Sequence, residues 1–237
     1  MDERFSRTAL ILGDEGMSRL RKSRVAVFGV GGVGGSCVLA LARSGVGALD
    51  VFDDDVVSVS NINRQAVAVT ATLGRPKAEA AAEIIAQINP EAVVRAHRLF
   101  YTPENADAVD LSVYDYIVDA IDTVKAKTEL IVRAQAAGVP IISAMGAGNK
   151  LDPTRFEVAD IYETSVCPLC RAMRAQLRRR GIARHRVVYS REEPLNAVAD
   201  DANGRHAPGS VSFVPPAVGL ILAGEVVRSL SRGGERR

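Results

Sequence analysis

The sequence has little of several features that would assign it to a broad class at once. Its 237 residues contain three cysteines, Cys37, Cys167 and Cys170, which is too few in a chain this long for the disulfide framework of a small secreted protein. The net charge is only +2, so no whole-protein field favours nucleic acid or a membrane surface. The first ten residues, MDERFSRTAL, are charged and lack the apolar core of a signal peptide.

Long hydrophobic runs are also absent. The longest apolar stretch, Val211–Val227, is interrupted by two prolines, two glycines and a glutamate, so we expect it to be too short and too broken to span a bilayer. Internal repeats and low-complexity linkers are not seen. With 47% apolar and 24% charged residues, the composition is ordinary for a globular protein with a proper core. These observations predict a cytoplasmic protein without a membrane partner.

Apolar runs rich in β-branched residues alternate with helix-like segments over the first 150 residues. Buried strands are expected over Arg24–Val30, Ala48–Asp53, Ala92–Arg98, Asp115–Ile121 and Pro140–Ala144. Helices are expected over Val33–Arg43, Lys77–Ile88, Pro103–Val109 and Val124–Ala137. This order predicts an α/β protein with a Rossmann-like, mostly parallel sheet and helices on both faces.

The pattern changes after Gly146. An exposed strand, an arginine-rich helix and a short strand are expected over Arg155–Ile161, Leu169–Arg180 and Val187–Ser190. Turn-forming residues fill Leu195–Ser210, which we predict to be a mobile loop, and Val214–Leu230 predicts an apolar C-terminal helix. We therefore expect a single domain, with a nucleotide-binding core over residues 1–150 and a substrate-facing extension over residues 151–237.

A glycine-rich segment follows the first expected strand and opens the helix after it. Its glycines are Gly29, Gly31, Gly32 and Gly34. Without Cβ atoms the backbone can approach a phosphate closely, and the start of the helix supplies N–H donors. Asp53 ends the next strand, where a carboxylate can accept hydrogen bonds from ribose hydroxyls. Together they predict a nucleotide site that fits NAD as well as ATP.

Two cations that follow Asp53 favour ATP. Arg64 and Lys77 suit a triphosphate that loses pyrophosphate, because negative charge must be held as the leaving group departs. Taken singly, each also fits a loop arginine or a solvated helix lysine. Asp122 ends a strand at the carboxyl edge of the sheet, where it is placed either to hold Mg²⁺ against phosphate oxygens or to cap the next helix.

Four ordered motifs, GVGGVG, DVFDDDVVSVSNINRQ, GRPKAEAA and DAIDTVKAK, resemble the ATP-binding signature of the superfamily of ThiF, MoeB and the ubiquitin-activating enzymes. The resemblance extends over most of the first 150 residues and implies an enzyme that adenylates a carboxylate with ATP and magnesium. By the family pattern, Asp53 binds the ribose and Asp122 positions the magnesium. The other residues assigned to the nucleotide and the reacting carboxylate are Asp55, Asn61, Arg64 and Lys77.

The segment Arg4-Phe5-Ser6-Arg7 is similar to the N-terminal motif of the same superfamily. In that motif the second arginine reaches the triphosphate of the partner subunit, and the members are usually homodimers. The resemblance therefore implies a homodimer in which Arg7 acts in trans, beside the catalytic residues Arg64, Lys77 and Asp122.

Further motifs point to one branch of the superfamily. RFSRTALILGDEG, INPEAVV, SAMGAGNKLDPTRFEVADI and VVYSREEPL resemble the tRNA threonylcarbamoyladenosine dehydratases over nearly the whole chain. The resemblance implies ATP-dependent activation of the threonyl carboxylate of the modified adenosine, followed by ring closure that expels AMP. It leaves open whether a sulfur-transfer protein takes part.

Other functions remain as alternatives. The first is activation of a ubiquitin-like sulfur carrier that ends in Gly-Gly. A non-catalytic nucleotide sensor is disfavoured because Arg64, Lys77 and Asp122 are all present, and a nicotinamide dehydrogenase lacks a recognisable acid or base for hydride transfer.

The arginines of the extension favour a tRNA substrate independently of the resemblance. Seven arginines and no acidic residue occur between Arg171 and Arg186, and Arg171, Arg174 and Arg178 recur at helical spacing. A positive strip of this kind suits a phosphate backbone. A solvated helix face is the alternative.

The motif Cys167-Pro-Leu-Cys170 is not assigned to catalysis. ThiF and MoeB relatives carry two such pairs that hold a structural zinc, whereas this chain has one. Cys37, His185 and His206 are poor candidates for the missing ligands, so no zinc site is expected. A reactive thiolate at the start of the arginine-rich helix is the alternative.

Overall fold

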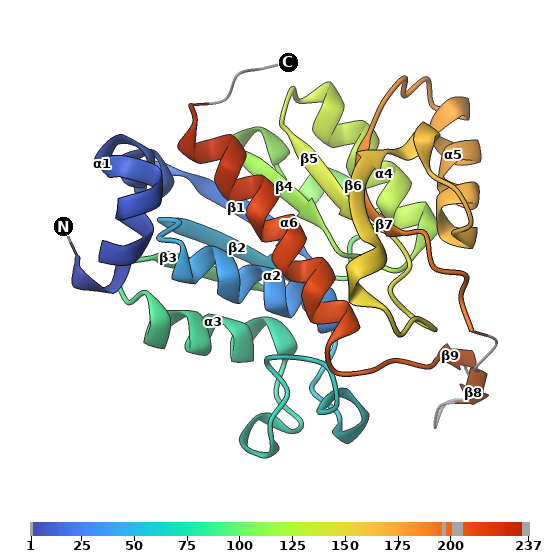
Figure 1. Ribbon diagram of the computed structural model, residues 1–237, viewed down its shortest axis with the longest axis horizontal. Coiled ribbons are helices and arrows are strands. Elements are labelled where there is room, and N and C mark those ends of the chain that lie inside the picture. Colours follow the sequence, from blue (N-terminus) through green and yellow to red (C-terminus); the bar gives the residue numbers. More distant parts are fainter. Residues whose placement is uncertain (1, 196–197, 201–205, 234–237) are drawn as a thin grey trace.

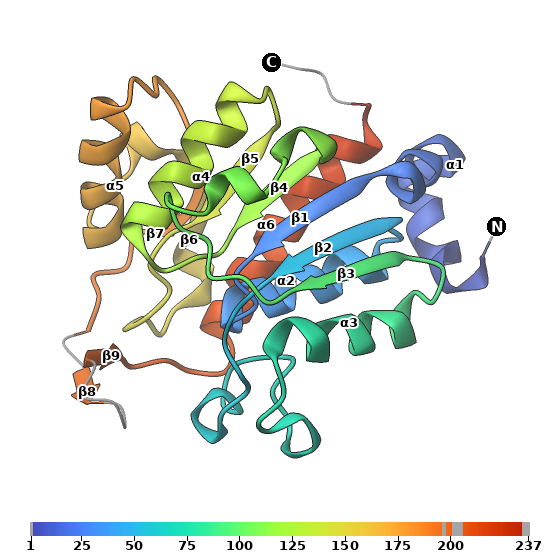
Figure 2. The same cartoon turned by 180° about the vertical axis from the view of Figure 1, so that it is seen from behind.

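The computed structural model describes residues 2–195, 198–200 and 206–233. A seven-stranded sheet of order β3-β2-β1-β4-β5-β7-β6 forms its centre (Figures 1 and 2). The strands are β1 (Arg24–Phe28), β2 (Ala48–Phe52), β3 (Val93–His97), β4 (Tyr116–Asp119), β5 (Ile141–Ala144), β6 (Phe156–Asp160) and β7 (Arg186–Ser190). All neighbouring strands pair in parallel except β6, which is antiparallel to β7. The predicted fold class is confirmed.

Helices cover both faces of this sheet. One face packs against α1 (Ser6–Lys22), α2 (Gly32–Arg43), α3 (Lys77–Ile88) and α6 (Val214–Ser231). The other packs against α4 (Val124–Ala136) and α5 (Pro168–Arg179). Successive strand residues point to opposite faces, so Val25 and Val27 join the first core while Ala26 and Phe28 join the second. Both sides of the central strands are apolar for this reason.

The structure has one helix that was not expected and lacks one helix that was. Helix α1 was not expected, because Gly13 interrupts it at φ 71° and its apolar side chains are divided between core and surface. The helix expected over Pro103–Val109 is wrong, since only a 3-10 turn forms there, at Ala106–Ala108.

The predicted loop Leu195–Ser210 is also wrong in its described part. Two short strands, β8 (Val198–Asp200) and β9 (His206–Pro208), pair with each other in antiparallel fashion. Strands of three residues carry too little alternation to be detected among turn-forming residues. Residues 196–197 and 201–205 of the predicted loop lie outside the described residues.

Helix α6 is longer than the sequence suggested. Its 18 residues have a mean hydropathy of 1.3, enough in length and composition to cross a bilayer, which corrects the expectation that this stretch is too short. Its packing explains its apolar character, because α6 lies along α2. A Cβ atom on Gly219 would lie only 2.2 Å from the carbonyl oxygen of Val33, so the two backbones are in close contact.

Candidate nucleotide site at the carboxyl edge of the sheet

The glycine-rich loop between β1 and α2 has a conformation that side chains would prevent. Gly29 has φ 86°, and its N–H donates to the carbonyl of Phe52 at 2.8 Å. A Cβ on Gly29 would lie 2.7 Å from the carbonyl oxygen of Ala120, and one on Gly34 would lie 1.8 Å from the carbonyl oxygen of Gly29. Glycine is therefore required at both positions.

The loop leaves open space at the start of α2. Gly31 is the N-cap of this helix, no side chain caps it, and a Cβ there would meet nothing nearer than Gln65 Nε2 at 3.9 Å. The N–H groups of the first helical turn are thus free to receive a phosphate. Gly32, in contrast, is crowded by Pro215 and by Arg64. Its lack of a side chain lets these residues pack closely against the loop and leaves no room for a ligand there.

Gln65 is a candidate site residue that sequence reasoning did not select. Its side chain is buried, and its Oε1 has no hydrogen-bond partner within the described part of the chain. A buried amide oxygen without a partner is costly. The Nε2 atom of the same amide group is the atom nearest to a Cβ on Gly31, so this amide is available to a ligand in the glycine-rich loop. The signal in the sequence was its position directly after Arg64.

Asp53 lies where the sequence placed it, directly after β2. Its carboxylate accepts hydrogen bonds from the N–H of Val30 at 2.6 Å and from the N–H of Asp55 at 2.9 Å. Burial raises the pKa of Asp53, while the N–H of Val30 and the charge of Lys77 act against that rise. The carboxylate therefore faces the glycine-rich loop, within the same small region as the phosphate-binding turn.

Lys77, the first residue of α3, is buried and already paired. Its ammonium group lies 2.7 Å from Asp55 Oδ2, and its backbone N–H donates to the Asp55 carbonyl. The structure thus brings Lys77, Asp55 and Asp53 together. An arriving phosphate would compete with the exposed Asp55 carboxylate for the lysine charge.

Arg64 and Asn61 belong to one compact turn. Asn61 is buried, and its Oδ1 accepts from the N–H of Ser58, so the side chain shapes the turn. The Arg64 guanidinium donates to the Ser60 carbonyl at 2.9 Å, and its Cγ would lie 3.5 Å from a Cβ on Gly32. Arg64 is therefore next to the glycine-rich loop.

Asp122 lies in the turn between β4 and α4, at the same edge of the sheet. The N-cap of α4 is Thr123, so the alternative role of Asp122 as helix cap is wrong. Its carboxylate is exposed and accepts a hydrogen bond from the Thr123 hydroxyl at 3.2 Å. An exposed carboxylate is the kind of ligand that suits a magnesium ion held mainly by phosphate oxygens.

A buried ion pair between Lys127 and Asp119 stabilises the turn that carries Asp122. Lys127 Nζ lies 2.9 Å from Asp119 Oδ2 and donates to the carbonyl of Ile121 at 2.9 Å. The N–H of Ile121 donates back to Asp119 Oδ1 at 3.1 Å. The residues on both sides of the turn are thus held by one lysine and one aspartate.

A neutral histidine lies close to this pair. His185 Nε2 is 2.7 Å from the Ser143 hydroxyl, and Ser143 is the partner of Asp119 across β4 and β5. Burial, and then the charge of Lys127, lowers the pKa of His185 to about 3. The ring carries no charge at neutral pH, which suits a site beside a buried ammonium group.

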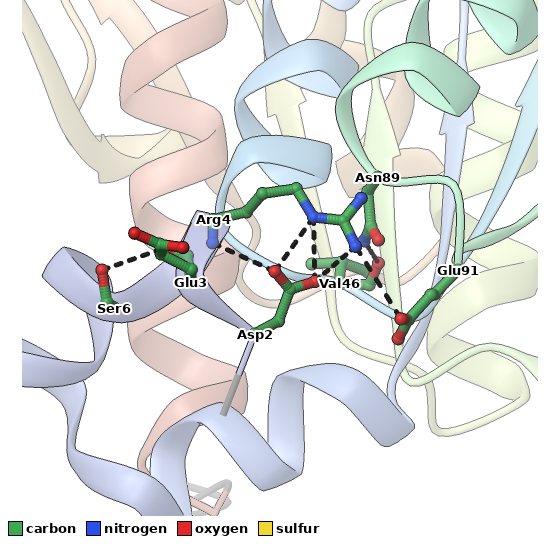
Figure 3. A network of polar contacts seen from close by, with 7 residues as sticks. All are labelled: Asp2, Glu3, Arg4, Ser6, Val46, Asn89 and Glu91. Carbon is green, nitrogen blue, oxygen red and sulfur yellow. Dashed lines mark hydrogen bonds and ion pairs between the residues drawn. The ribbon is translucent and has the colours of Figure 1, made fainter.

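Arg7 lies far from these residues in its own subunit. It is exposed on the first turn of α1. The start of α1 is held by Arg4, which pairs with Asp2 and lies 3.7 Å from Glu91 (Figure 3). Glu91 lies two residues before β3, so this region belongs to the amino edge of the sheet, opposite the glycine-rich loop.

The predicted tRNA-binding arginines follow α5 away from the candidate site. The N-cap of α5, Cys167, lies beside Gly146 at the carboxyl edge. Its far end lies by Tyr162, just past β6, where β7 begins. Arg171 is exposed near the first end, whereas the Arg178 guanidinium stacks over the Tyr162 ring at 5.1 Å. The expectation that the whole helix lies over the carboxyl edge is wrong for its second half.

Arg174 has a structural contact instead of a free charge. Its guanidinium donates to the carbonyl of Thr164 at 3.0 Å and to the Thr164 hydroxyl. It therefore fastens α5 to the segment before it.

The two cysteines of the CxxC motif are buried free thiols at the start of α5. Among the described residues no group of three or more histidine, cysteine or acidic side chains is placed to hold a metal ion. Cys37 lies inside α2 and His185 is bonded to Ser143, while the His206 side chain lies outside the description. The lack of zinc stays a prediction.

Known proteins resemble this chain over its full length. Residues 5–237 match the ThiF family. The tRNA threonylcarbamoyladenosine dehydratase of Bacillus subtilis is 42% identical over 242 residues, which cover 97% of this chain and 95% of the relative. The structure of the Escherichia coli tRNA N6-threonylcarbamoyladenosine dehydratase in complex with AMP has a TM-score of 0.90 at 31% identity, and covers 99% of this chain and 96% of its own. The structure of the same enzyme in complex with ATP has a TM-score of 0.86 at 31% identity, and covers 98% of this chain and 96% of its own. This chain belongs to the ThiF family.

Proposed function

We propose that this protein uses ATP to adenylate a carboxylate, and that the carboxylate is the threonyl group of threonylcarbamoyladenosine in tRNA. One observation carries the adenylation: an open phosphate-binding turn at Gly31 lies in one region with a ribose-type carboxylate, two cations and a free carboxylate. Full-length similarity to the dehydratases of B. subtilis and E. coli supports the substrate.

The residues fit the ATP and magnesium that this proposal needs. Asp53 is assigned to the ribose, the N–H groups at the start of α2 to the phosphates, and Gln65 Oε1 to a donor of the nucleotide. Lys77 and Arg64 neutralise the charge that builds up as pyrophosphate leaves. Asp122 would hold the magnesium ion, which supplies charge neutralisation on the phosphate oxygens.

The reaction balances without a further reagent. The threonyl carboxylate attacks the α-phosphorus of ATP, forms an acyl adenylate and expels pyrophosphate. A nitrogen of the substrate's own carbamoyl group then attacks the acyl carbon and closes a ring, and AMP leaves. The tRNA loses one water molecule in total. No sulfur atom is needed, so a sulfur-transfer partner stays an expectation of the family resemblance.

We further propose that the chain acts as a cytoplasmic homodimer with Arg7 supplied in trans. Leu10 and Ile11 are 87% and 85% exposed on α1, and the spacing of three and four residues puts them on one helix face with Arg7. Exposed apolar side chains beside a cation that is remote from its own nucleotide site suit a surface covered by a second copy.

The direct test supplies Mg-ATP with each candidate substrate. Transfer RNA that bears threonylcarbamoyladenosine should release AMP and pyrophosphate in equal amounts, and the nucleoside should lose the mass of one water. Unmodified tRNA is the matched control. AMP formation with a carrier protein that ends in Gly-Gly, and none with the modified tRNA, would replace this proposal by the sulfur-carrier alternative.

A further inference from the structure

The CxxC pair has a geometry that the proposed reaction does not use. Cys167 is the N-cap of α5, Pro168 is its first residue and Cys170 follows within the first turn. Both thiols are free and buried. In this spacing at a helix start the sulfurs lie on the same side of the chain, within reach of a disulfide.

The surroundings of the Cys167 sulfur favour its thiolate form. A Cβ atom on Gly146 would lie 3.7 Å from this sulfur, so the backbone of the loop after β5 passes close to it. The Cys170 thiol, and then the backbone N–H groups of Cys170, Gly146 and Leu169, lower the pKa of Cys167 against the opposing effect of burial. The same contact raises the pKa of Cys170, since its proton is held between the sulfurs. Loss of a proton is therefore favoured at Cys167 and opposed at Cys170.

The backbone before the pair is strained. Val166 has φ 61° and its side chain is 40% exposed. A β-branched residue in the left-handed region is an outlier that costs energy. Cys167 itself is only 3% exposed, so an oxidant must be close to a water molecule in size, and relaxation at Val166 offers a route for it.

We propose that Cys167 and Cys170 form a redox modification site, at which hydrogen peroxide closes a reversible disulfide. The Cys167 thiolate attacks one peroxide oxygen, becomes a sulfenic acid and releases hydroxide. The Cys170 sulfur then attacks the Cys167 sulfur, and its proton leaves with the departing oxygen as water. Two thiols lose two electrons in total, and the peroxide is reduced. A dithiol reductant reverses the change.

Closure of this disulfide alters the loop after β5. This loop is bonded to the extension that we expect to face the tRNA substrate, so its effect on the tRNA step rests on the proposed function. The sulfur in a disulfide is uncharged and loses most of its attraction for the Gly146 N–H. Three residues further on, Asn149 is bonded through its backbone to Gly209 and Leu195, and through its Oδ1 to the Gly209 N–H. The loop therefore joins the thiols to both segments that flank β8 and β9.

The experiment treats the reduced full-length protein with hydrogen peroxide, removes the peroxide, unfolds the protein in denaturant, blocks free thiols with iodoacetamide and digests it with trypsin. The peptide Phe156–Arg171 contains both cysteines. It should lose two hydrogen atoms in mass and escape alkylation, and dithiothreitol should restore it. In the oxidised protein, the rate of AMP release with modified tRNA should fall by up to about a hundredfold, which is the effect of a small misplacement of reacting groups. The affinity for ATP should stay unchanged.

Cysteine variants test whether the disulfide forms between Cys167 and Cys170 without Cys37. Cys170→Ser should form no disulfide, and a sulfenic-acid probe should label it at Cys167. Cys37→Ser should behave like the parent, because burial raises the pKa of Cys37 far above neutrality. If both thiols of the parent stay open to alkylation after peroxide, the site is refuted. If the disulfide forms while AMP release is unchanged, its control of the tRNA step is refuted. If the reduced protein has no activity on tRNA, the proposed function fails, and the peptide masses still decide the redox site.

Discussion

Lys127 Nζ lies 2.9 Å from Asp119 Oδ2, and neither side chain has any exposed surface. Lys127 also donates a hydrogen bond to the carbonyl of Ile121. Ala120, which lies between Asp119 and Ile121 in the sequence, packs against Gly29. The turn that presents Asp122 and the glycine-rich loop are thus supported by the same pair. Two buried charges that form an ion pair are costly to separate.

Loss of one partner should destabilise the whole fold. For Lys127→Met we expect the free energy of unfolding to drop by about 3–5 kcal/mol, since the Asp119 carboxylate is left buried and unpaired. Lys125→Met is the matched control on the same helix, where an exposed surface pair with Glu104 should change stability by less than about 1 kcal/mol. Urea titrations measure both. Equal effects of the two substitutions would show that the buried pair contributes nothing special.

His185 should make the protein less stable in mild acid. Its pKa of about 3 in the folded state lies below the ordinary value of about 6.5 in the unfolded chain. The unfolded chain therefore binds the proton first, and the free energy of unfolding should fall as pH drops below about 6.5, by up to about 1.4 kcal/mol per pH unit. Denaturant titrations between about pH 7 and 5 measure this slope. In this range carboxyl groups with ordinary pKa values stay largely ionised.

The comparison of variants isolates the histidine. His185→Gln can keep a hydrogen bond to Ser143 and should have a flatter pH dependence than the parent. An unchanged slope in the His185 variant would assign the acid sensitivity to other groups.

The glycine-rich loop should tolerate a methyl group at one position and not at its neighbour. In Gly34→Ala the new Cβ would lie 1.8 Å from the Gly29 carbonyl oxygen, so the phosphate-binding turn must distort and ATP binding should be lost. In Gly35→Ala the nearest atom is 3.4 Å away, so binding should stay close to that of the parent. Calorimetric titration with ATP and with NAD tests both variants. Tight binding of NAD by the parent, with no binding of ATP, would overturn the assignment of the nucleotide.

Hybrid dimers test the role of Arg7. Arg7→Ala and Asp122→Ala should each abolish most turnover while the protein stays dimeric. A mixture of the two chains should recover part of the activity, because one site of each hybrid combines an intact Arg7 with an intact Asp122. Subunit exchange is verified with two distinguishable tags. Hybrids that form without any recovery would remove Arg7 from the partner's site.

The exposed arginines of α5 should set the salt dependence of tRNA binding. Replacement of Arg171 and Arg178 by alanine should weaken binding and reduce the salt slope by about 0.9 for each lost phosphate contact, or about 0.7 where the contact is to a single strand. Arg95→Ala, on the edge strand β3 at the other end of the sheet, is the matched control. Filter binding over a range of salt concentrations measures the slopes. An unchanged slope in the double variant would make α5 a solvated face only.

Parts of this structure could be predicted from residues near in sequence, and others could not. The helix Lys77–Ile88 was predicted with its observed bounds, because alanine-rich helical spacing and the Asn89-Pro90 stop are local signals. The glycine-rich loop and Asp53 were also found locally. The buried partner of Lys77, the orphaned oxygen of Gln65 and the contact of Arg174 with Thr164 depend on tertiary packing, which no local pattern records. Arginine spacing indicated a helix face but not the direction in which that helix runs.

The contact between Gly219 and the Val33 carbonyl has a consequence for biosynthesis. Helix α2 carries the phosphate-binding turn near the start of the chain, and α6, which packs on it, is near the end of the described residues. A nascent chain that has just left the ribosome with α2 exposed still lacks the element that covers its apolar side. The nucleotide-binding half therefore cannot complete its packing until α6 has been synthesised, and during that interval the apolar side of α2 is exposed to aggregation.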